Sequence, residues 1–213
     1  MHELLIGAKR LPGFSGDWGP TKLGACLLTP PDYGINAASV EYSDRLPSYI
    51  RITDITSDGR FSPHPPVSVE HPNADHYYLS EGDLIFARTG ASVGKSCLYN
   101  PLDGSLVFAG FLIRIRPDPL KLNPVFLFAF VQTAAYWNWV KVMSMRSGQP
   151  GINANEFAQL PITIPLMIEQ EAIAAILVDL DMELIELEKK LTKACYLKQA
   201  MMQELLTGKT RLI

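Results

Sequence analysis

The pattern of hydrophobic and polar residues changes near residue 165. Before this point the chain is rich in Pro and Gly, and its apolar runs are short and bounded by turn residues. Beyond it no Pro occurs, and the only Gly is Gly208. Short runs with frequent turns are typical of a compact mixed domain, whereas a long stretch without breakers is typical of one helix. The pattern predicts an α/β (α+β) globular domain over residues 1–165 and a long coiled-coil α-helix within residues 166–213.

Three apolar runs in the first region predict β-strands. They lie at residues 49–55, 84–87 and 106–115. In the last run Ile113 and Ile115 alternate with Arg114 and Arg116. Because successive side chains of a strand point to opposite faces, we expect one face of this strand to be buried and the other to be cationic.

One helix and several long loops are expected between these strands and residue 165. Asn123 and Pro124 form a suitable N-cap and first-turn pair for a helix over residues 125–131. The pattern allows this helix to continue past a kink to Val140. The expected loops cover residues 29–48, 56–78 and 141–156. Loops of this length in a compact domain are usually functional or disordered.

The C-terminal region carries the signals of one helix from about residue 167 to 207. Pro165 favours an extended entry, Glu169 and Glu171 suit the first turn, and Lys209 suits the end. An apolar seam with alternating spacings of three and four follows: Leu177, Leu180, Leu184, Leu187, Leu191 and Ala194. Such a helix is roughly 60 Å long, too long to be covered by its own domain along its whole length. We therefore expect a second long helix to cover the seam; the alternative is an amphipathic helix packed on its own domain.

Composition and charge narrow the possible functions. The chain has 213 residues, of which 47% are hydrophobic, enough for a sizeable core. A net charge of −3 argues against nucleic-acid binding by the whole surface but allows a local basic patch. Residues 161–188 hold seven acidic residues and no Lys or Arg, and residues 189–213 hold six Lys or Arg and one Glu. Two such helices lying antiparallel would bring the acidic start of one beside the basic end of the other.

Cysteine usage and hydropathy bear on the compartment. Cys26, Cys97 and Cys195 are far apart and include no C-x-x-C pair, so neither a disulfide framework nor a structural zinc site is supported. The N-terminus lacks the apolar stretch of a signal peptide. The most apolar run, residues 125–131, is far shorter than the roughly 20 residues that span a bilayer. We expect a cytoplasmic protein without a membrane segment.

The most motif-like segment is A-R-T-G-A-S-V-G-K-S at residues 87–96. Its end matches the phosphate-binding P-loop G-x-x-x-x-G-K-[ST], but Thr89 stands where the first Gly is required, and the following residues are too short for a helix. A P-loop-like nucleotide-binding protein is kept only as an alternative. Two further interpretations are compatible with each other: a glycine-shaped turn between two strands, and a loop that offers Arg88, Thr89, Ser92 and Lys95 to DNA phosphates.

No catalytic or metal-binding constellation emerges from the sequence. His64, His71, Asp75 and His76 lie in a Pro-rich loop without the spacing of metal ligands. Pairs of carboxylate residues flank the expected turns. At such positions they more often accept hydrogen bonds from the backbone of the turn than take part in catalysis. No nucleophile, base and orienting group come together in the sequence, so we expect no catalytic residue, no metal and no cofactor.

Several residues in the expected loops are of the types that contact base edges and phosphates. They are Tyr42, Arg45, Tyr49, Arg60, Tyr77, Arg146, Gln149 and Asn153. Each one singly is also compatible with an ordinary surface position. Trp137 and Trp139, in contrast, lie on the expected helix, where we expect them in the core or in an interface.

The two ends of the chain resemble each other. The sequence M-Q-E-L-L-T-G-K-T-R-L-I at 202–213 matches M-H-E-L-L-I-G-A-K-R-L-P at 1–12 at seven of twelve positions. Self-similarity of this kind is typical of tandem architectures. The chain has the pattern of one repeat unit that begins with the last turns of a preceding helix and ends with the same turns again.

Eight short segments, in a fixed order, are shared with one known family. They are L-P-G-F-S-G-D-W at 11–18, Y-I-R-I-T-D-I at 49–55, G-D-L-I-F-A-R-T-G-A-S-V-G-K at 82–95, F-L-I-R-I-R-P at 111–117, Q-P-G-I-N-A-N-E-F at 149–157, L-P-I-T-I-P at 160–165, E-Q at 169–170 and L-L-T-G-K-T-R-L at 205–212. With these segments the chain resembles the specificity subunits of type I restriction-modification systems over nearly its whole length. No segment is specific alone, whereas all of them in this order are.

The resemblance implies a target-recognition, DNA-binding domain over residues 1–165 and a helical spacer and dimerisation region over residues 166–213. The domain would read one half of a bipartite site in double-stranded DNA, and the helix would dock the DNA methyltransferase (modification) subunit and the restriction (translocase and nuclease) subunit. The chain itself would be non-catalytic. The candidate DNA-binding residues are Arg45, Arg60, Arg88, Thr89, Ser92, Lys95, Arg146 and Gln149, and the candidate dimerisation residues are Leu177, Leu180, Leu184, Leu187 and Leu191.

The sequence departs from the family pattern in one respect. A typical member has two units in tandem with their long helices antiparallel, whereas this sequence has one unit. The second helix would come from a second copy, in a homodimer, or from a tandem second unit. The remaining alternative is a coiled-coil scaffold without DNA contact, for which an exchange of the 29–78 loops would not change methylation specificity.

Overall fold

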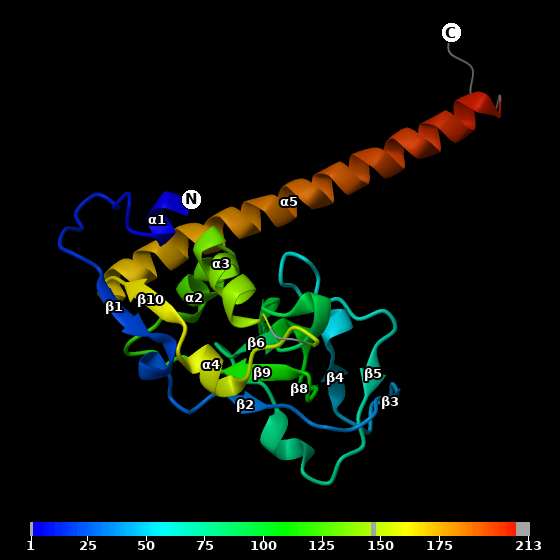
Figure 1. Cartoon of the computed structure of the whole chain (residues 1–213). Coiled ribbons are helices and arrows are strands. Elements are labelled where there is room, and N and C mark those ends of the chain that lie inside the picture. Colours follow the sequence, from blue (N-terminus) through cyan, green and yellow to red (C-terminus); the bar gives the residue numbers. More distant parts are fainter. Residues whose placement is uncertain (1, 146–147, 208–213) are drawn as a thin grey trace. The chain divides into compact units, whose positions relative to one another are not determined.

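The chain forms two compact units, which are described separately (Figure 1). The structure is a computed structural model and describes residues 2–145 and 148–207. One unit comprises Met1–Ile173 and the other Ala174–Ile213. The described strands are β1 Gly19–Lys22, β2 Asp32–Tyr33, β3 Val40–Glu41, β4 Ser48–Ile50, β5 Val67–Ser68, β6 Leu84–Ala87, β7 Ser96–Leu98, β8 Leu106–Phe108, β9 Leu112–Ile115 and β10 Pro161–Ile164. The described α-helices are α1 His2–Leu5, α2 Pro124–Phe130, α3 Ala134–Met143, α4 Ala154–Ala158 and α5 Met167–Leu206. This strand-rich domain with a long C-terminal helix confirms the predicted fold class.

The strands form two four-stranded sheets and one pair. The first sheet has the order β2-β9-β6-β7, the second has the order β3-β5-β4-β8, and β1 pairs with β10. Strand β6 has the sequence Leu-Ile-Phe-Ala, and all four of its residues are buried, as in a strand that is covered on both faces. Its bounds confirm the strand predicted over residues 84–87.

The hydrophobic core lies between the two larger sheets. Ile50 and Phe108 of the second sheet pack in one cluster with Ile85 and Leu112 of the first. These side chains are almost inaccessible to solvent. Full burial of each such side chain contributes roughly 1.5–3 kcal/mol, so this cluster ties the two sheets into one domain.

The predicted strand over residues 106–115 is in fact two strands in different sheets. Strand β8 pairs with β4, and β9 pairs with β6 and β2. The chain crosses from one sheet to the other at residues 109–111. The amide of Gly110 donates to the carbonyl oxygen of Ile35 at 2.7 Å, and a Cβ at this position would lie 3.1 Å from that oxygen. Glycine accommodates this close approach of two backbones because it has no Cβ. The hydrophobic pattern of the run does not predict it.

The expected cationic face of this strand is also wrong, because both arginines are tied to carboxylates. The Arg114 guanidinium, which is buried, donates to both oxygens of Asp32 at 3.1 and 2.6 Å. Arg116 donates to both oxygens of Asp83 at 2.8 Å. A buried charge is tolerated only when it is paired. Both guanidinium charges therefore serve the interior of the domain.

The strand predicted over residues 49–55 is shorter than expected. Strand β4 ends at Ile50, and a 3₁₀ turn follows over Ile52–Asp54. The buried Asp54 carboxylate accepts hydrogen bonds from the backbone amide of Arg51 at 2.8 Å and from its guanidinium at 2.9 and 2.8 Å. This local capping competes with the continuation of the strand.

The helix predicted over residues 125–131 is confirmed as α2, and its expected continuation to Val140 is a separate helix, α3. The Asn123 side chain caps α2 by accepting from the amides of Val125 and Phe126 at 2.9 and 3.1 Å. Thr133 separates the helices: its hydroxyl donates to the Phe130 carbonyl at 2.7 Å and accepts from the amide of Tyr136, in the first turn of α3. The stretches expected to be loops contain the short elements β2, β3, β5 and the start of α4.

The start of α5 is fixed inside the first unit by two polar side chains. The buried Glu169 carboxylate accepts from the Arg10 guanidinium at 2.6 Å on both oxygens. The buried Gln170 side chain accepts from the amide of Asn123 at 2.9 Å and donates to the carbonyls of Lys121 and Pro165 at 3.0 Å. Glu169 lies in the first turn of α5, as predicted, and it also forms an ion pair across 159 residues of sequence.

In the rest of α5, most leucines of the predicted seam are exposed. Helix α5 is 40 residues long and ends at Leu206, which confirms the predicted helix. Leu184 and Leu187 are each 52% exposed, and Leu191 is 65% exposed. The Lys209 expected at the helix end lies outside the described residues. Among the described helices, none is both long enough and apolar enough to cross a membrane.

The close approach at Gly34 makes a first prediction. A Cβ on Gly34 would lie well inside 3.0 Å of the backbone oxygens of Phe108 and Ala109, whereas a Cβ on Gly19 would meet nothing within 4 Å. We expect Gly34→Ala to lower the free energy of unfolding by roughly 1–3 kcal/mol or more. Gly19→Ala, the matched control, should change it by less than about 0.5 kcal/mol. Thermal unfolding of the two variants checks this, and equal midpoints would contradict it.

A second prediction compares two Asp–Arg pairs of similar length and different burial. Asp83 is 1% exposed and pairs with Arg116 at 2.8 Å, whereas Asp58 is 54% exposed and pairs with Arg60 at 2.9 Å. We expect Asp83→Ala to cost roughly 3 kcal/mol, because it leaves a partly buried guanidinium unpaired. Asp58→Ala should cost less than about 1 kcal/mol, since water replaces an exposed partner. Denaturant unfolding measures the loss in free energy of unfolding for both variants. Equal losses would show that burial does not determine how much each ion pair contributes to stability.

Candidate functional site

The P-loop-like segment is a β-hairpin connection between β6 and β7. The amide of Ala87 donates to the carbonyl of Lys95, and the amide of Gly94 donates to the carbonyl of Ala87, both at 2.8 Å. Gly94 has a φ of +85°, a conformation that favours glycine. A strand follows the segment, and the Lys95 amine donates to the carbonyl of Ile55 at 2.5 Å. The glycine-shaped turn is confirmed, and the geometry lacks the helix N-terminus that a P-loop requires.

The hairpin is bound to a segment more than fifty residues away. Thr89 forms a β-bridge with Gly151, the amide of Gly90 donates to the carbonyl of Pro150 at 3.0 Å, and the amide of Ile152 donates to the carbonyl of Arg88 at 2.9 Å. A Cβ on Gly90 would lie 3.3 Å from the Gln149 amide nitrogen. Three of the predicted residues, Arg88, Thr89 and Gln149, are thereby brought together.

Arg88 occupies an unusual position within this cluster. Its guanidinium lies over the ring of Tyr33, with 4.9 Å between the guanidinium carbon and the ring centroid. Its Nε atom is buried and has no hydrogen-bond partner among the described residues. The Tyr33 hydroxyl accepts from the amide of Ala154 at 3.1 Å, which fixes the ring. The Arg88 side chain is thus half-buried, stacked and incompletely bonded, which suits a ligand-binding guanidinium.

Two aromatic residues that the sequence did not single out belong to the same surface. Tyr33 is half-exposed beneath Arg88, and Phe111 is exposed at the crossing between β8 and β9. The carbonyl of Phe111 accepts from the amide of Arg88 at 3.1 Å. The one available signal was an aromatic residue beside a glycine, in Tyr33-Gly34 and Gly110-Phe111. That signal is too common to identify a site by itself.

Arg60 and Lys95 form a second group, beside Asp58. Arg60 pairs with Asp58 at 2.9 Å. A hydrogen bond from Thr56, and then the charges of Arg60 and Lys95, lower the pKa of the Asp58 carboxyl below its usual value. The carboxylate therefore stays ionised at neutral pH and offsets part of the charge of both cations. Ser92 lies in the 3₁₀ turn of the hairpin over Gly90–Ser92.

The remaining candidates are dispersed or serve the fold. Arg45 is exposed in the turn between β3 and β4, apart from the hairpin in sequence and in sheet. Arg146 lies outside the described residues. The buried Tyr49 donates from its hydroxyl to the carbonyl of Ile35 at 2.7 Å, and Asn153 caps α4 together with Glu156. Tyr49 and Asn153 are therefore structural residues.

The other aromatic candidates also make structural contacts. The Tyr42 hydroxyl donates to Asp44 at 2.9 Å, and the Tyr77 ring packs edge-on against Phe108. Trp139 lies beside the buried Phe157, in the core region where it was expected. Trp137 is 40% exposed, so it is only partly a core residue.

The described residues show no metal cluster, and two of the cysteines, Cys26 and Cys97, are buried. No group of three or more His, Cys, Asp or Glu residues lies together there in a metal-binding arrangement. Burial raises the pKa of the Cys97 thiol to about 12, and burial also raises that of Cys26. Neither cysteine supplies a thiolate at neutral pH. Asp75 lies in a 3₁₀ turn, and His71 packs edge-on against the ring of Tyr77.

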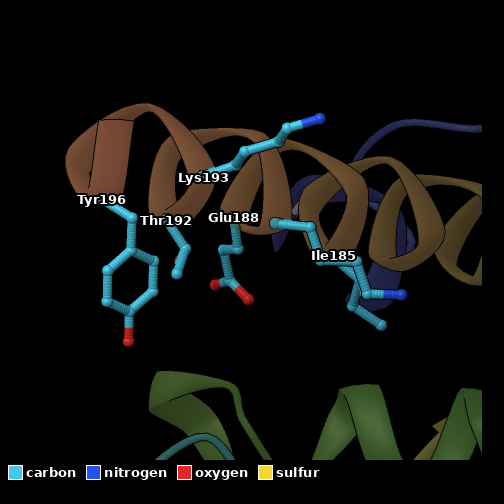
Figure 2. Close-up of a pocket in the computed structure, with 6 residues that line it drawn as sticks. Ile185, Glu188, Thr192, Lys193 and Tyr196 are labelled. Atoms are coloured by element: carbon cyan, nitrogen blue, oxygen red, sulfur yellow. The ribbon is translucent and has the colours of Figure 1, made fainter. Parts of the chain in front are cut away.

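Helix α5 presents a second face beside its leucine seam. A shallow pocket on the helix is lined by Ile185, Glu188, Lys189, Thr192, Lys193 and Tyr196. Figure 2 shows Ile185, Glu188, Thr192 and Tyr196 extending to the same side of the helix. Residues spaced by three or four share one face of a helix. The helix therefore has two surfaces, one lined by leucines and one mixed, on which another chain can pack.

One protein-family model matches this chain over residues 41–194. It is described as the type I restriction modification DNA specificity domain. The match includes both larger sheets from β3 onward, the 88–95 hairpin, the 149–152 segment and much of α5. Both groups of candidate residues, and the predicted seam, lie within it.

The relatives described here are each about twice as long as this chain, which spans about half of each solved structure that it matches. The type I restriction enzyme MjaX specificity subunit of Methanocaldococcus jannaschii is 28% identical over 134 residues, which is 62% of this chain and 32% of that protein. A chain in a structure on assembly of the type I R-M system has a TM-score of 0.61 at 21% identity, covering 95% of this chain and 51% of that one. The HsdS subunit from Thermoanaerobacter tengcongensis has a TM-score of 0.60 at 21% identity, covering 92% and 49%. These structural likenesses show a shared fold.

Proposed function

Because the chain belongs to the family of type I restriction-modification DNA specificity domains, we propose that it supplies the DNA sequence specificity of such a complex. In this proposal residues 1–165 form the target-recognition domain, which reads one half of a bipartite site. Residues 166–213 form the spacer and dimerisation helix. The chain itself is non-catalytic, and the methyltransferase and restriction subunits carry the chemistry.

The observation that carries the proposal is the continuity of the family match across both units. It begins at residue 41 in the first unit and ends at residue 194 in the second. A match to the helix alone would have favoured a coiled-coil scaffold. The chain covers about half of each solved relative, which supports one recognition unit rather than two.

The hairpin surface is the part of the domain best suited to DNA. Arg88, Thr89 and Gln149 lie together there, next to two accessible aromatic rings. Arginine, hydroxyl and amide side chains are the usual partners of phosphates and base edges. The domain as a whole is nearly neutral, with 13 basic and 14 acidic residues in positions 1–160. Since phosphate contacts supply much of the affinity for DNA, one unit alone should bind weakly.

The helix supplies the assembly contacts. The exposed seam that includes Leu184 and Leu187 requires a partner, because a stripe of apolar side chains on a long helix is stabilised by burial. In the 213-residue chain we propose a second copy as that partner, with the helices antiparallel so that opposite charges face each other. In a longer protein a tandem unit would fill the same place. The face around Thr192 and Tyr196 remains for the methyltransferase and restriction subunits.

The nucleotide-binding alternative is not favoured. Its key residue, Lys95, donates to a backbone carbonyl, and a strand follows instead of a helix. The scaffold alternative accounts for the helix but leaves the match over the recognition domain without a purpose.

A segment exchange tests the recognition role. Residues 29–78 contribute strands β2 to β5 and can be exchanged as one block with the corresponding segment of a relative. We expect the exchange to change the methylated sequence in one half of the bipartite site when the chimera is expressed with its modification subunit. The matched control exchanges residues 101–105, which surround the exposed Leu102, and should leave the methylated sequence unchanged. An unchanged methylome in the folded 29–78 chimera would favour the scaffold.

Sedimentation tests the role of the seam. The wild-type chain should sediment as a dimer at high micromolar concentration. The double variant Leu184→Ala/Leu187→Ala should weaken the dimer by roughly 100-fold or more. The control Met182→Ala/Leu197→Ala removes side chains of similar exposure, 54% and 61%, from outside the seam and should leave the dimer intact. A wild-type monomer at this concentration, or equal effects of the two double variants, would contradict the proposed pairing.

A further inference from the structure

A groove that includes Phe111 lies beside the hairpin surface, because the amide of Arg88 donates to the carbonyl of Phe111 at 3.1 Å. It runs between the 35–39 segment, the 49–53 segment and the crossing at 109–111, all in the first unit. Its floor includes Ile35 and Tyr49, which are almost fully buried. We call it the Phe111 groove. Of its lining residues, Tyr49 was named from the sequence as a residue type that contacts DNA, but its hydroxyl is bound to the Ile35 carbonyl.

Phe111 is an exposed aromatic residue on a rigid backbone. Its side chain is 56% exposed. On either side, the amide of Gly110 donates to the carbonyl of Ile35 at 2.7 Å and the amide of Leu112 donates to the carbonyl of Ala109 at 2.8 Å. Its own carbonyl is bound by the amide of Arg88. A rigid aromatic ring offers contact area at a small cost in conformational entropy, which makes such residues common anchors in binding surfaces.

The rim of the groove carries polar side chains that can form hydrogen bonds. Asn36, Ser39 and Thr53 line the groove and are exposed. Within the described part of the chain, the side chains of Asn36 and Ser39 make no hydrogen bond to other residues. Amide and hydroxyl groups are the neutral side chains that read donor and acceptor patterns on base edges. An apolar floor with such a rim fits the edge of a base pair.

The charges around the groove favour a polyanion. Arg51 lines the groove, but Asp54 binds its guanidinium through both oxygens. Asp32 is likewise occupied by Arg114. Arg88 differs, because its guanidinium stacks on the ring of Tyr33 and its amide binds the carbonyl of Phe111. Because the guanidinium groups of Arg51 and Arg114 are paired with carboxylates, we take the guanidinium of Arg88 as the positive charge that can bind a DNA phosphate.

From these contacts we propose that the Phe111 groove reads base edges of the target duplex, with Asn36 and Phe111 as specificity-determining residues and Arg88 bound to the adjacent phosphate. The inference rests on the proposed function and names the residues that would perform it. It assigns sequence reading to the groove, and backbone positioning to the hairpin beside it. The two roles have different experimental signatures, because phosphate contacts contribute to every DNA sequence and base contacts contribute to one.

The test uses the complex with the modification subunit and the target sequence found by methylation mapping. Affinities are measured for the target duplex and for an unrelated duplex, over a series of salt concentrations. We expect Phe111→Ala and Asn36→Ala each to weaken target binding by roughly 10-fold or more and to leave binding of the unrelated duplex unchanged. Arg88→Gln should weaken both and lower the slope of log K against log salt by about 0.9.

Two controls separate a local effect from a general one. Leu120→Ala removes another highly exposed apolar side chain, and Lys121→Ala removes a cation that already pairs with Asp118; both should behave as wild type. Phe111→Leu keeps an apolar side chain and tests whether the aromatic ring itself is required. Thermal unfolding of each variant confirms that it is folded, which is expected because Phe111 and Asn36 are exposed.

Each outcome bears on one claim. Wild-type discrimination by folded Phe111→Ala and Asn36→Ala complexes would overturn the inference while leaving the proposed function intact. A wild-type complex that does not distinguish target from unrelated DNA would instead overturn the proposed function. Loss of the modification subunit from the Phe111→Ala complex, with the sequence preference retained, would show that the groove binds protein and would likewise overturn the inference.

Discussion

The close approach of the 34–35 backbone to the 108–112 backbone organises the first unit of the chain. The amide of Ile35 donates to the carbonyl of Phe108 at 2.8 Å, and the Ile35 carbonyl accepts from Gly110 at 2.7 Å and from the Tyr49 hydroxyl at 2.7 Å. These bonds join a segment that continues from the first sheet to the crossing from β8 to β9. They also fix one wall and the floor of the Phe111 groove. The packing of the two sheets and the shape of the Phe111 groove therefore depend on the same backbone contact.

Charge is distributed so that most arginines near the core serve the fold. Arg10, Arg51, Arg114 and Arg116 each bind both oxygens of one carboxylate. Removal of one partner from such a pair is costly, so these residues are poor sources of ligand-binding charge. Arg88 differs because an aromatic ring, rather than a carboxylate, supports its guanidinium. The near-neutral domain thus keeps an accessible cation where its hydrogen-bonding side chains converge.

Much of the architecture could be predicted from the sequence, because it depends on local signals. The breaker-free stretch with its repeated leucines predicted α5, and the Asn123-Pro124 pair predicted the start of α2. The errors arose where distant segments meet. The 106–115 run is divided between sheets by the contact at Gly110, and Arg114 and Arg116 pair with the carboxylates of Asp32 and Asp83. The sequence identified three residues of the site by their chemical type: Arg88, Thr89 and Gln149. It could not identify Tyr33, Phe111 and Asn36, because only the tertiary structure places them in the site.

Hydrogen exchange of the assembled complex, with and without its target duplex, tests the central claim most directly. The claim is that DNA lies across the hairpin and the Phe111 groove. It predicts that the duplex protects backbone amides at residues 36–39, 88–92 and 109–111, with little change at the exposed 101–105 turn. Protection by the target that is confined to α5, or that spares all three segments, would contradict the account.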